Sequence, residues 1–191
     1  MRTLLAPPPE RAPWYLRPAL WITRRITGKD PLPARLLARF PKGAIGAGVF
    51  EALAAHSPRD LDGRVLAAAR VVASRTTGCP FCLDMNAASR RDAGLEPAEL
   101  SALLDDDDAR WDALGEREAL AARWARALSS TPVVVAPELE ERLRVAFTPR
   151  EIVVLAHAIA QVSFWSRFNQ ALGVPAAGFH DDPACPLPPL G

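Results

Sequence analysis

The residues of this sequence whose type and spacing best suit a chemical reaction are two cysteines three positions apart, Cys79 and Cys82. Residues three apart lie about one turn apart on an α-helix, so the two sulfurs can meet in a disulfide. Gly78 relaxes the backbone before the pair, and Pro80 suits a first helical turn. We therefore expect Cys79 at or near an N-cap and Cys82 in the first turn, where backbone N–H groups and the helix dipole stabilise a thiolate. A thiolate is the nucleophile that reacts with a peroxide or a disulfide.

Other interpretations of the cysteine pair stay open on the sequence alone. Free cysteines are often buried as small hydrophobic side chains, so Cys79 and Cys82 can also serve packing. A zinc site needs about four ligands. Only Asp84 lies near the pair, and the third cysteine, Cys185, is alone in a proline-rich tail. The acidic run 105–108 is typical of a solvated loop rather than a cation site. The sequence therefore predicts no metal.

The composition is that of an ordinary globular protein. Of 191 residues, 49% are apolar and 24% are charged, and the formal net charge of +1 gives no footprint for a nucleic acid. The most apolar stretch, 152–172, holds too many polar residues for a membrane span. Residues 1–15 do not resemble a secretory signal, so we expect the cytoplasm, where a close cysteine pair is more often catalytic or metal-binding than structural.

The prolines divide the chain into a body and two arms. Eight of the 19 prolines fall in residues 1–41 and five follow residue 174. We expect a proline-rich N-terminal arm over 1–42, a helical domain over 43–174 and a loose C-terminal tail over 175–191. The N-terminal arm is expected to wrap over the body or a neighbouring subunit, with Trp14, Tyr15 and Trp21 as apolar anchors.

The body is predicted to be all-α, because alanine and leucine dominate and apolar residues recur at helical spacing. Asp60 is a plausible N-cap for the second predicted helix, and Thr148 for the last one. The predicted helices cover residues 44–56, 61–75, 80–93, 97–104, 116–128 and 149–172, with a shorter one around 137–145.

The cysteine segment resembles the core motif of the AhpD-like / carboxymuconolactone decarboxylase family. That motif is an apolar helix, a C-x-x-C with an aromatic residue before the second cysteine, and a small-residue helix that closes with arginine-x-x-Gly-Leu. The resemblance covers roughly residues 40–175 and extends to the last helix through 167–173. The matching residues are Gly78-Cys79-Pro80-Phe81-Cys82, Asn86-Ala87-Ala88 and Arg91-Asp92-Ala93-Gly94-Leu95.

The resemblance implies an AhpD-like helical bundle that works without a cofactor. In the peroxidase members of the family, the second cysteine, here Cys82, attacks the hydroperoxide, and the first, here Cys79, resolves it as a disulfide. A dithiol reductant protein then reduces the pair again. Members are commonly homo-oligomers, trimers or hexamers. The helix dipole favours a low pKa for Cys79 instead, so the order of the two pKa values stays open.

Two family positions differ in this sequence. The relay glutamate twelve residues before the first cysteine is replaced by Ala67, and the relay histidine four residues after the second is replaced by Asn86. Asn86 can hydrogen-bond to a thiolate or a water but does not titrate near neutral pH. General base assistance is worth typically about 10²–10⁴-fold, so we expect weak activity unless another group substitutes. The candidates for that acid–base role are Asp84, Glu51 and His157, although a core role is the favoured interpretation of His157.

The leading hypothesis is therefore a thiol-dependent peroxidase or disulfide oxidoreductase of AhpD-like type, acting on a hydroperoxide or another small molecule. A cofactor-free carboxymuconolactone-type decarboxylase is an alternative, which Ala67 and Asn86 disfavour because that chemistry needs an acid–base residue. A third hypothesis is a non-enzymatic oligomeric redox sensor or scaffold. Its interface would use Phe164, Trp165 and Phe168, unless these aromatics fill the core of the protomer.

Overall fold

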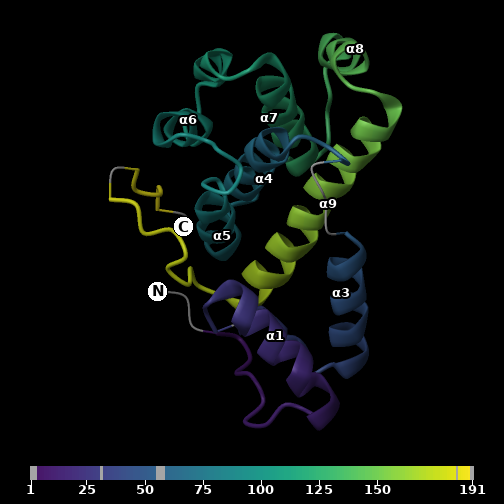
Figure 1. The fold of residues 1–191 in the computed structure, drawn as a ribbon, viewed down its shortest axis with the longest axis vertical. Coiled ribbons are helices and arrows are strands. Elements are labelled where there is room, and N and C mark those ends of the chain that lie inside the picture. The colour runs from purple at the N-terminus through teal and green to yellow at the C-terminus, as the bar shows by residue number, and fades with distance from the viewer. Residues whose placement is uncertain (1–3, 31, 55–58, 184, 190–191) are drawn as a thin grey trace.

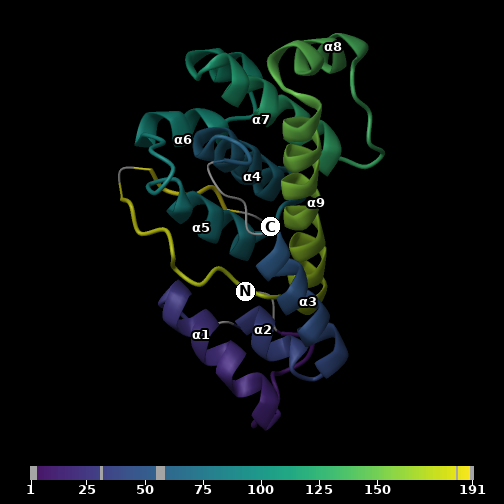
Figure 2. The same ribbon diagram turned by 45° about the vertical axis from the view of Figure 1, so that its right-hand side comes forward.

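The computed structural model describes residues 4–30, 32–54, 59–183 and 185–189 of the chain. Over these ranges the protein forms α-helices and two short 3₁₀ helices with no strand, which confirms the all-α prediction. Figures 1 and 2 show a helical body above a smaller N-terminal unit. The elements are η1 (Trp14–Leu16), α1 (Arg17–Thr27), α2 (Leu32–Leu37), α3 (Pro41–Leu53), α4 (Gly63–Thr77), α5 (Pro80–Ser89), α6 (Pro97–Leu103), η2 (Asp108–Ala113), α7 (Glu116–Ser129), α8 (Pro137–Ala146) and α9 (Pro149–Leu172).

Helix α4 is the centre of the body. It packs against α7, α9 and α5, and nine of its 15 residues are buried. Most of these are alanine and valine, whose small side chains let the neighbouring helices approach closely. Larger side chains such as Leu120, Leu155 and Ile159 fill the space around it and are at most 1% exposed. This core fixes the end of α4, and therefore the place where α5 begins.

Local signals set the helix boundaries of the body. Thr148 caps α9 as predicted, and the Glu151 side chain returns to its backbone N–H in a capping box. Asp62, not the predicted Asp60, caps α4 by accepting the Arg64 N–H at 2.7 Å. Asp60 instead pairs with Arg150 at 2.7 Å. Two acidic residues flank Leu61, and the one directly before the first helical turn is the one that caps it.

Helix α5 is shorter than predicted, ending at Ser89 rather than near residue 93. The N–H groups of Ala93 and Leu95 both bond to the Arg90 carbonyl, and Gly94 adopts a φ of +74°, so the chain turns back on itself. The buried Arg90 guanidinium closes this turn through the Leu95 carbonyl at 2.8 Å and Asp182 at 2.5 Å. The turn therefore also attaches the C-terminal segment to the body, and the expectation that this segment is loose is wrong.

The N-terminal region is more regular than the prolines suggested. It contains α1 and α2, because Pro18, Pro33 and Pro41 all lie in first helical turns, where proline is compatible with a helix. The predicted anchors are largely exposed in the described chain: Trp14 is 80%, Tyr15 46% and Trp21 66% exposed. The first predicted helix, over residues 44–56, corresponds to α3, and its predicted end at His56 lies outside the described residues.

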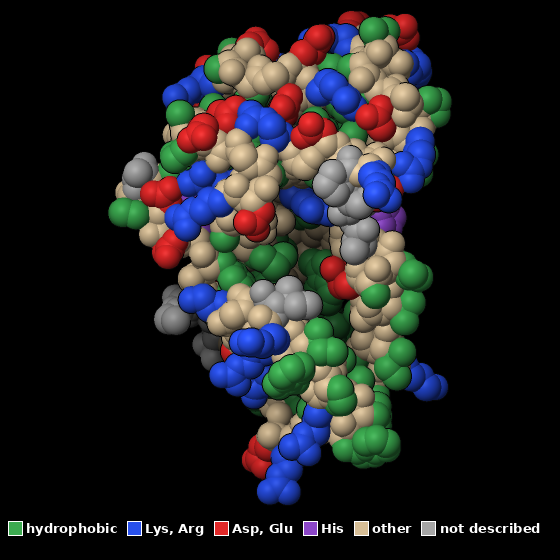
Figure 3. Space-filling view, viewed as in Figure 1, with side chains coloured by type: hydrophobic (Ala, Val, Ile, Leu, Met, Phe, Trp, Pro, Cys, Tyr) green, Lys and Arg blue, Asp and Glu red, His purple; other side chains and the backbone are tan. Residues whose placement is uncertain are grey.

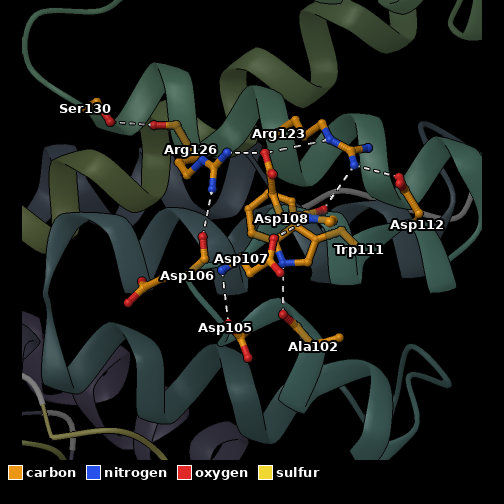
Figure 4. A network of polar contacts seen from close by, with 11 residues as sticks. Ala102, Asp105, Asp106, Asp107, Asp108, Trp111, Asp112, Arg123, Arg126 and Ser130 are labelled. Atoms are coloured by element: carbon orange, nitrogen blue, oxygen red, sulfur yellow. Dashed lines mark hydrogen bonds and ion pairs between the residues drawn. The ribbon is translucent and has the colours of Figure 1, made fainter.

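The acidic run 105–108 is organised by arginines rather than being a simple solvated loop (Figure 4). Asp107 caps η2, Asp106 pairs with Arg75 at 3.0 Å, and Asp108 pairs with Arg126. Trp111, buried in the same segment, donates from Nε1 to the Ala102 carbonyl at 2.9 Å. The run therefore fixes the connection between α6 and α7.

Two further findings concern the described residues only. None of their helices combines the length and the apolar character that a membrane crossing requires. No three of their histidine, cysteine, aspartate and glutamate side chains gather closely enough to hold a metal ion.

Candidate active site

Cys79 occupies the N-cap of α5, as predicted. Gly78, with a φ of +69°, ends α4 in the left-handed conformation and turns the chain directly into Cys79. The Cys79 Sγ accepts the backbone N–H of Cys82 at 3.2 Å, so a thiol performs the capping role that serine or aspartate usually has. Both cysteines are free and buried, 0% and 2% exposed.

The two thiols hydrogen-bond to each other, and this contact separates their acidities. The hydrogen bond from the Cys82 side chain is the largest cause that lowers the pKa of Cys79, to about 7, against the opposing effect of burial. The same hydrogen bond, followed by burial and the charge of Cys79, raises the pKa of Cys82. At neutral pH the pair therefore holds one proton on Cys82 and, in about half of the molecules, a negative charge on Cys79.

Two side chains of α9 complete the surroundings of the sulfurs. Asn169 donates from Nδ2 to the Cys82 Sγ at 3.5 Å, and Ser166 hydrogen-bonds to both cysteines and lowers their pKa values. Ser166 also shares a hydrogen bond of 2.9 Å with Thr77 at the end of α4. Both α9 residues are at most 1% exposed. The sulfurs therefore lie in a small polar site that α4, α5 and α9 build together.

The polar site contains one unused acceptor. The Oδ1 atom of Asn169 is buried and has no hydrogen-bond partner among the described residues. A buried carbonyl oxygen without a donor costs about 1–3 kcal/mol, so this atom favours the binding of a water or of a substrate O–H beside Cys82.

An apolar cover separates the sulfurs from solvent. Leu36 of α2, Phe81 of α5 and Val174 after α9 are buried with the cysteines in one cluster, separate from the main core of the body. Side chains from both ends of the chain pack on it, including Leu4, Leu32, Ala177 and Phe179. A substrate or reductant therefore reaches the sulfurs only when part of this cover moves.

Asn86, at the family's relay histidine position, faces α4 instead of the sulfurs. Its Nδ2 donates to Ser74 Oγ at 2.8 Å, and that hydroxyl donates to the Arg70 carbonyl. Ala67, at the relay glutamate position, is buried one turn before Arg70. No described contact joins Asn86 to either cysteine, so its side chain binds α5 to α4.

Asp84, one of the candidate acid–base residues, holds the C-terminal segment. Its buried carboxylate accepts three backbone N–H groups, from Ala177 at 2.7 Å, Phe179 at 3.1 Å and His180 at 2.8 Å. These contacts use both oxygens of the carboxylate. Asp84 therefore positions the segment that covers the cysteines, and no described contact brings it to the sulfurs.

The other two candidates, Glu51 of α3 and His157 of α9, lie where these two helices face each other. Glu51 Oε1 accepts Gln161 Nε2 at 2.9 Å and Trp165 Nε1 at 2.6 Å. Because Trp165 packs on the cysteine cluster, Glu51 is one side chain removed from it. His157 is exposed, and its ring packs edge to face on the Phe50 ring with 5.5 Å between the ring centroids. The expectation that it is a core histidine is therefore wrong.

Sequence reasoning missed Ser166 and Asn169 as site residues. Both are polar residues, three apart, within the most apolar helix of the chain. Such a pair shares one helix face, and that face is buried here. This spacing was the available signal, but the cysteines lie more than 80 residues earlier in the chain, so only the fold shows which sulfurs the pair meets.

Comparison with known proteins supports the fold. No protein-family model matches the chain. The uncharacterized protein YnjA of Escherichia coli (strain K12) is 29% identical over 177 residues, which cover 90% of this chain and 93% of that protein. The debrominase Bmp8, solved as a cysteine-to-alanine variant with 2,3,4-tribromopyrrole, superposes with a TM-score of 0.72 at 20% identity, covering 94% of both chains. An uncharacterized peroxidase-related protein from Silicibacter sp. TM1040 superposes with a TM-score of 0.73 at 18% identity, covering 91% and 93%.

These likenesses establish a shared helical architecture over nearly the whole chain. The fold is similar to that of the debrominase Bmp8 and of the peroxidase-related protein. The structural likeness covers more of the chain than residues 40–175, to which the predicted resemblance applied.

Proposed function

We propose that this protein is a thiol–disulfide oxidoreductase of AhpD-like type that reduces a hydroperoxide through Cys79 and Cys82. The single observation that carries the proposal is the hydrogen-bonded pair of free thiols at the start of α5, with the pKa of Cys79 lowered to about 7. A pair that shares one proton near neutral pH supplies both the nucleophile and the base that a peroxidase needs.

The chemistry follows from the position of that proton. Cys82 passes its S–H proton to the Cys79 thiolate, and the Cys82 thiolate attacks the outer oxygen of the hydroperoxide. The O–O bond breaks, the alkoxide leaves and takes up a proton as an alcohol, and Cys82 becomes a sulfenic acid. The Cys79 sulfur then attacks Cys82, water leaves, and a disulfide forms. Two thiols have been oxidised by one hydroperoxide, and a dithiol reductant protein restores them.

In this proposal, Cys79 and the α9 residues take over the task of the missing relay. Cys79 is the proton acceptor, while Ser166 and Asn169 hold the two sulfurs by hydrogen bonds. The free Oδ1 of Asn169 accepts the O–H of the hydroperoxide and so orients its oxygen toward Cys82. Because the side chains that cover the sulfurs must move before a substrate can enter, the proposal favours small hydroperoxides.

The test is hydroperoxide consumption with a dithiol reductant, for wild type, Cys79→Ser and Cys82→Ser. We expect both variants to lose turnover. Cys79→Ser lacks both the proton acceptor and the resolving thiol, so a sulfenic acid on Cys82 should form slowly and persist, and dimedone trapping with mass spectrometry would locate it. Equal consumption by wild type and Cys82→Ser would reject the proposal. Dimedone added to the wild type during turnover should label Cys82, and a label on Cys79 instead would reject the assignment of Cys82 as the attacking thiol.

A second candidate is reductive debromination, which the shared architecture with the debrominase Bmp8 favours. The same thiol pair would exchange a carbon–bromine bond for carbon–hydrogen, releasing bromide and a proton and forming the same disulfide. The assay therefore includes 2,3,4-tribromopyrrole and a more highly brominated pyrrole as oxidants. Bromide release that requires Cys82, without hydroperoxide consumption, would favour this candidate over the first.

A further inference from the structure

Helix α3 is apolar but buries none of its residues in the described chain. Its 13 residues include one lysine and one glutamate, and the rest are apolar or glycine. Ile45, Val49 and Leu53 are 52%, 53% and 83% exposed. These positions follow one another at spacings of four residues, so they form a stripe along one side of the helix. A stripe of this kind is typical of a helix that packs against another helix.

Helix α9 continues the apolar surface beside α3. The Phe50 ring of α3 packs edge to face on the Phe164 ring of α9, with 6.0 Å between the ring centroids, so the two helices are in contact. Phe164 and Val153 of α9 remain 48% and 68% exposed. Figure 1 shows α3 alongside α9, and Figure 3 shows hydrophobic side chains gathered on the same side of the molecule, over α3. We call this surface, formed by Ile45, Val49, Leu53 and Phe164, the α3–α9 face.

The charge distribution shows what fits this face. Residues 1–53 carry nine lysines and arginines against three acidic residues, a net charge of +6. Residues 54–191 carry 14 against 19, a net charge of −5. Three residues of the α3–α9 face lie on α3, the last helix of the basic region, which lies beside α9 of the acidic region (Figure 1). Two copies placed antiparallel would bring each basic N-terminal unit beside the acidic body of the other.

We propose that the α3–α9 face binds the same face of a second copy of this chain around a two-fold axis. The proposal is independent of the thiol chemistry. A two-fold contact is self-complementary, so the apolar stripe of each copy covers that of the other, and the opposite charges at the two ends meet. The centre of the face is depleted of charge, as the cores of protein interfaces are.

An anionic membrane is the competing partner, since α1 carries Arg17, Arg24 and Arg25 around the exposed Trp21. Two observations favour the second copy. The acidic body, with its charge of −5, would be repelled by the same lipids that attract α1. The α3 stripe carries only Lys42 beside its apolar residues, which suits a protein partner better than lipid head groups.

The test is the mass of the full chain in solution, by light scattering and sedimentation. Wild type should be an assembly with an even number of subunits. Val49→Glu with Leu53→Glu, and separately Phe164→Glu, should each shift the mass to that of the monomer or of half the assembly. Val145→Glu is the matched control, because Val145 is 82% exposed on α8, outside the face, and should leave the mass unchanged. Circular dichroism checks that every variant is helical.

A monomeric wild type, an assembly with three subunits, or an unchanged mass in the two face variants would each overturn the proposal. Flotation with phosphatidylglycerol vesicles tests the competitor. Binding of a monomeric wild type to these vesicles, lost in Trp21→Ala, would replace the second copy with a membrane surface. The hydroperoxide assay on the same variants keeps the two proposals separate, because the mass can change while the thiol chemistry is unaffected.

Discussion

Replacing Cys82 by alanine should remove the main reason for the acidity of Cys79. The hydrogen bond from the Cys82 side chain is the largest cause of the lowered pKa, while burial opposes it. Without that donor, the backbone N–H of residue 82, Ser166 and Asn169 remain, and burial then dominates. We expect the pKa of Cys79 to return to its ordinary value of 9.0 or higher.

The expected change is large at neutral pH. With a pKa of about 7, about half of the Cys79 side chains are thiolate at pH 7; with a pKa of 9, about 1% are, a roughly 50-fold loss. The direction of the pH dependence of stability follows from the charge of Cys79. The native state holds Cys79 ionised between pH 7 and 9, where the unfolded chain keeps it protonated. Stability from this group therefore rises over that range, is present above it, and is lost as the pH falls through 7.

The assay is a pH titration of the ultraviolet absorbance of the thiolate, which does not require a reagent to enter the buried site. It is carried out in a Cys185→Ser background, so that a third thiol does not contribute. Cys82→Ser is the matched control, because its hydroxyl can still donate to Cys79, and its midpoint should lie between those of wild type and Cys82→Ala. A midpoint for Cys79 near 7 in Cys82→Ala would show that Cys82 does not cause the acidity of Cys79, and a single wild-type midpoint near 9 would show that Cys79 is not acidic.

Three further outcomes follow from the site. Asn169→Ala should slow oxidation of the pair by hydroperoxide about five- to tenfold, from the loss of about 1 kcal/mol of hydrogen bonding, with unchanged helicity; an unchanged rate would exclude it as a positioning residue. Asp84→Ala should lower the free energy of unfolding by about 3 kcal/mol, because three backbone N–H groups lose their acceptor, and should expose the C-terminal segment to protease; a variant as resistant as wild type would contradict the tether. Leu36→Ala should thin the cover and accelerate the reaction of the thiols with an aromatic disulfide reagent, at a stability cost of about 2–3 kcal/mol; an unchanged rate would show that α2 does not limit access.

Local signals predicted the parts of the fold that depend on neighbouring residues. Gly78 and Pro80 placed Cys79 at an N-cap, because a left-handed glycine and a first-turn proline each have a local backbone reason. Thr148 and Glu151 marked the start of α9 in the same way, through a capping box that spans four residues. The order of the cysteine pKa values, which the sequence left open, is set mainly by the hydrogen bond between the two side chains, and the backbone N–H of Cys82 at the N-cap contributes less.

The features that the sequence did not reveal depend on distant contacts. Asp84 was a candidate acid–base residue by its closeness to Cys82 along the chain, but its carboxylate binds a segment more than 90 residues later. The prolines of the N-terminal region suggested an irregular arm, although first-turn positions make the same prolines compatible with helices. Asn86 matched a family position, and only the packing of α5 on α4 shows that it bonds to Ser74.

The loss of the relay residues is the feature that distinguishes this site. Ala67 leaves no carboxylate there, yet the sulfurs are still polarised, because an N-cap, a second thiol and two α9 side chains surround them. The cover contributed by both ends of the chain then determines which molecules reach the pair. Acidity and access are therefore set by different segments, and the variants above change them separately.

The most direct test is to add one equivalent of hydroperoxide to the reduced full chain and map the products by mass spectrometry of its peptides. We expect a disulfide between Cys79 and Cys82 that forms within the time of peroxide loss, while Cys185 stays free. Peroxide that persists with both thiols unchanged, or a product that links Cys185 instead, would contradict it.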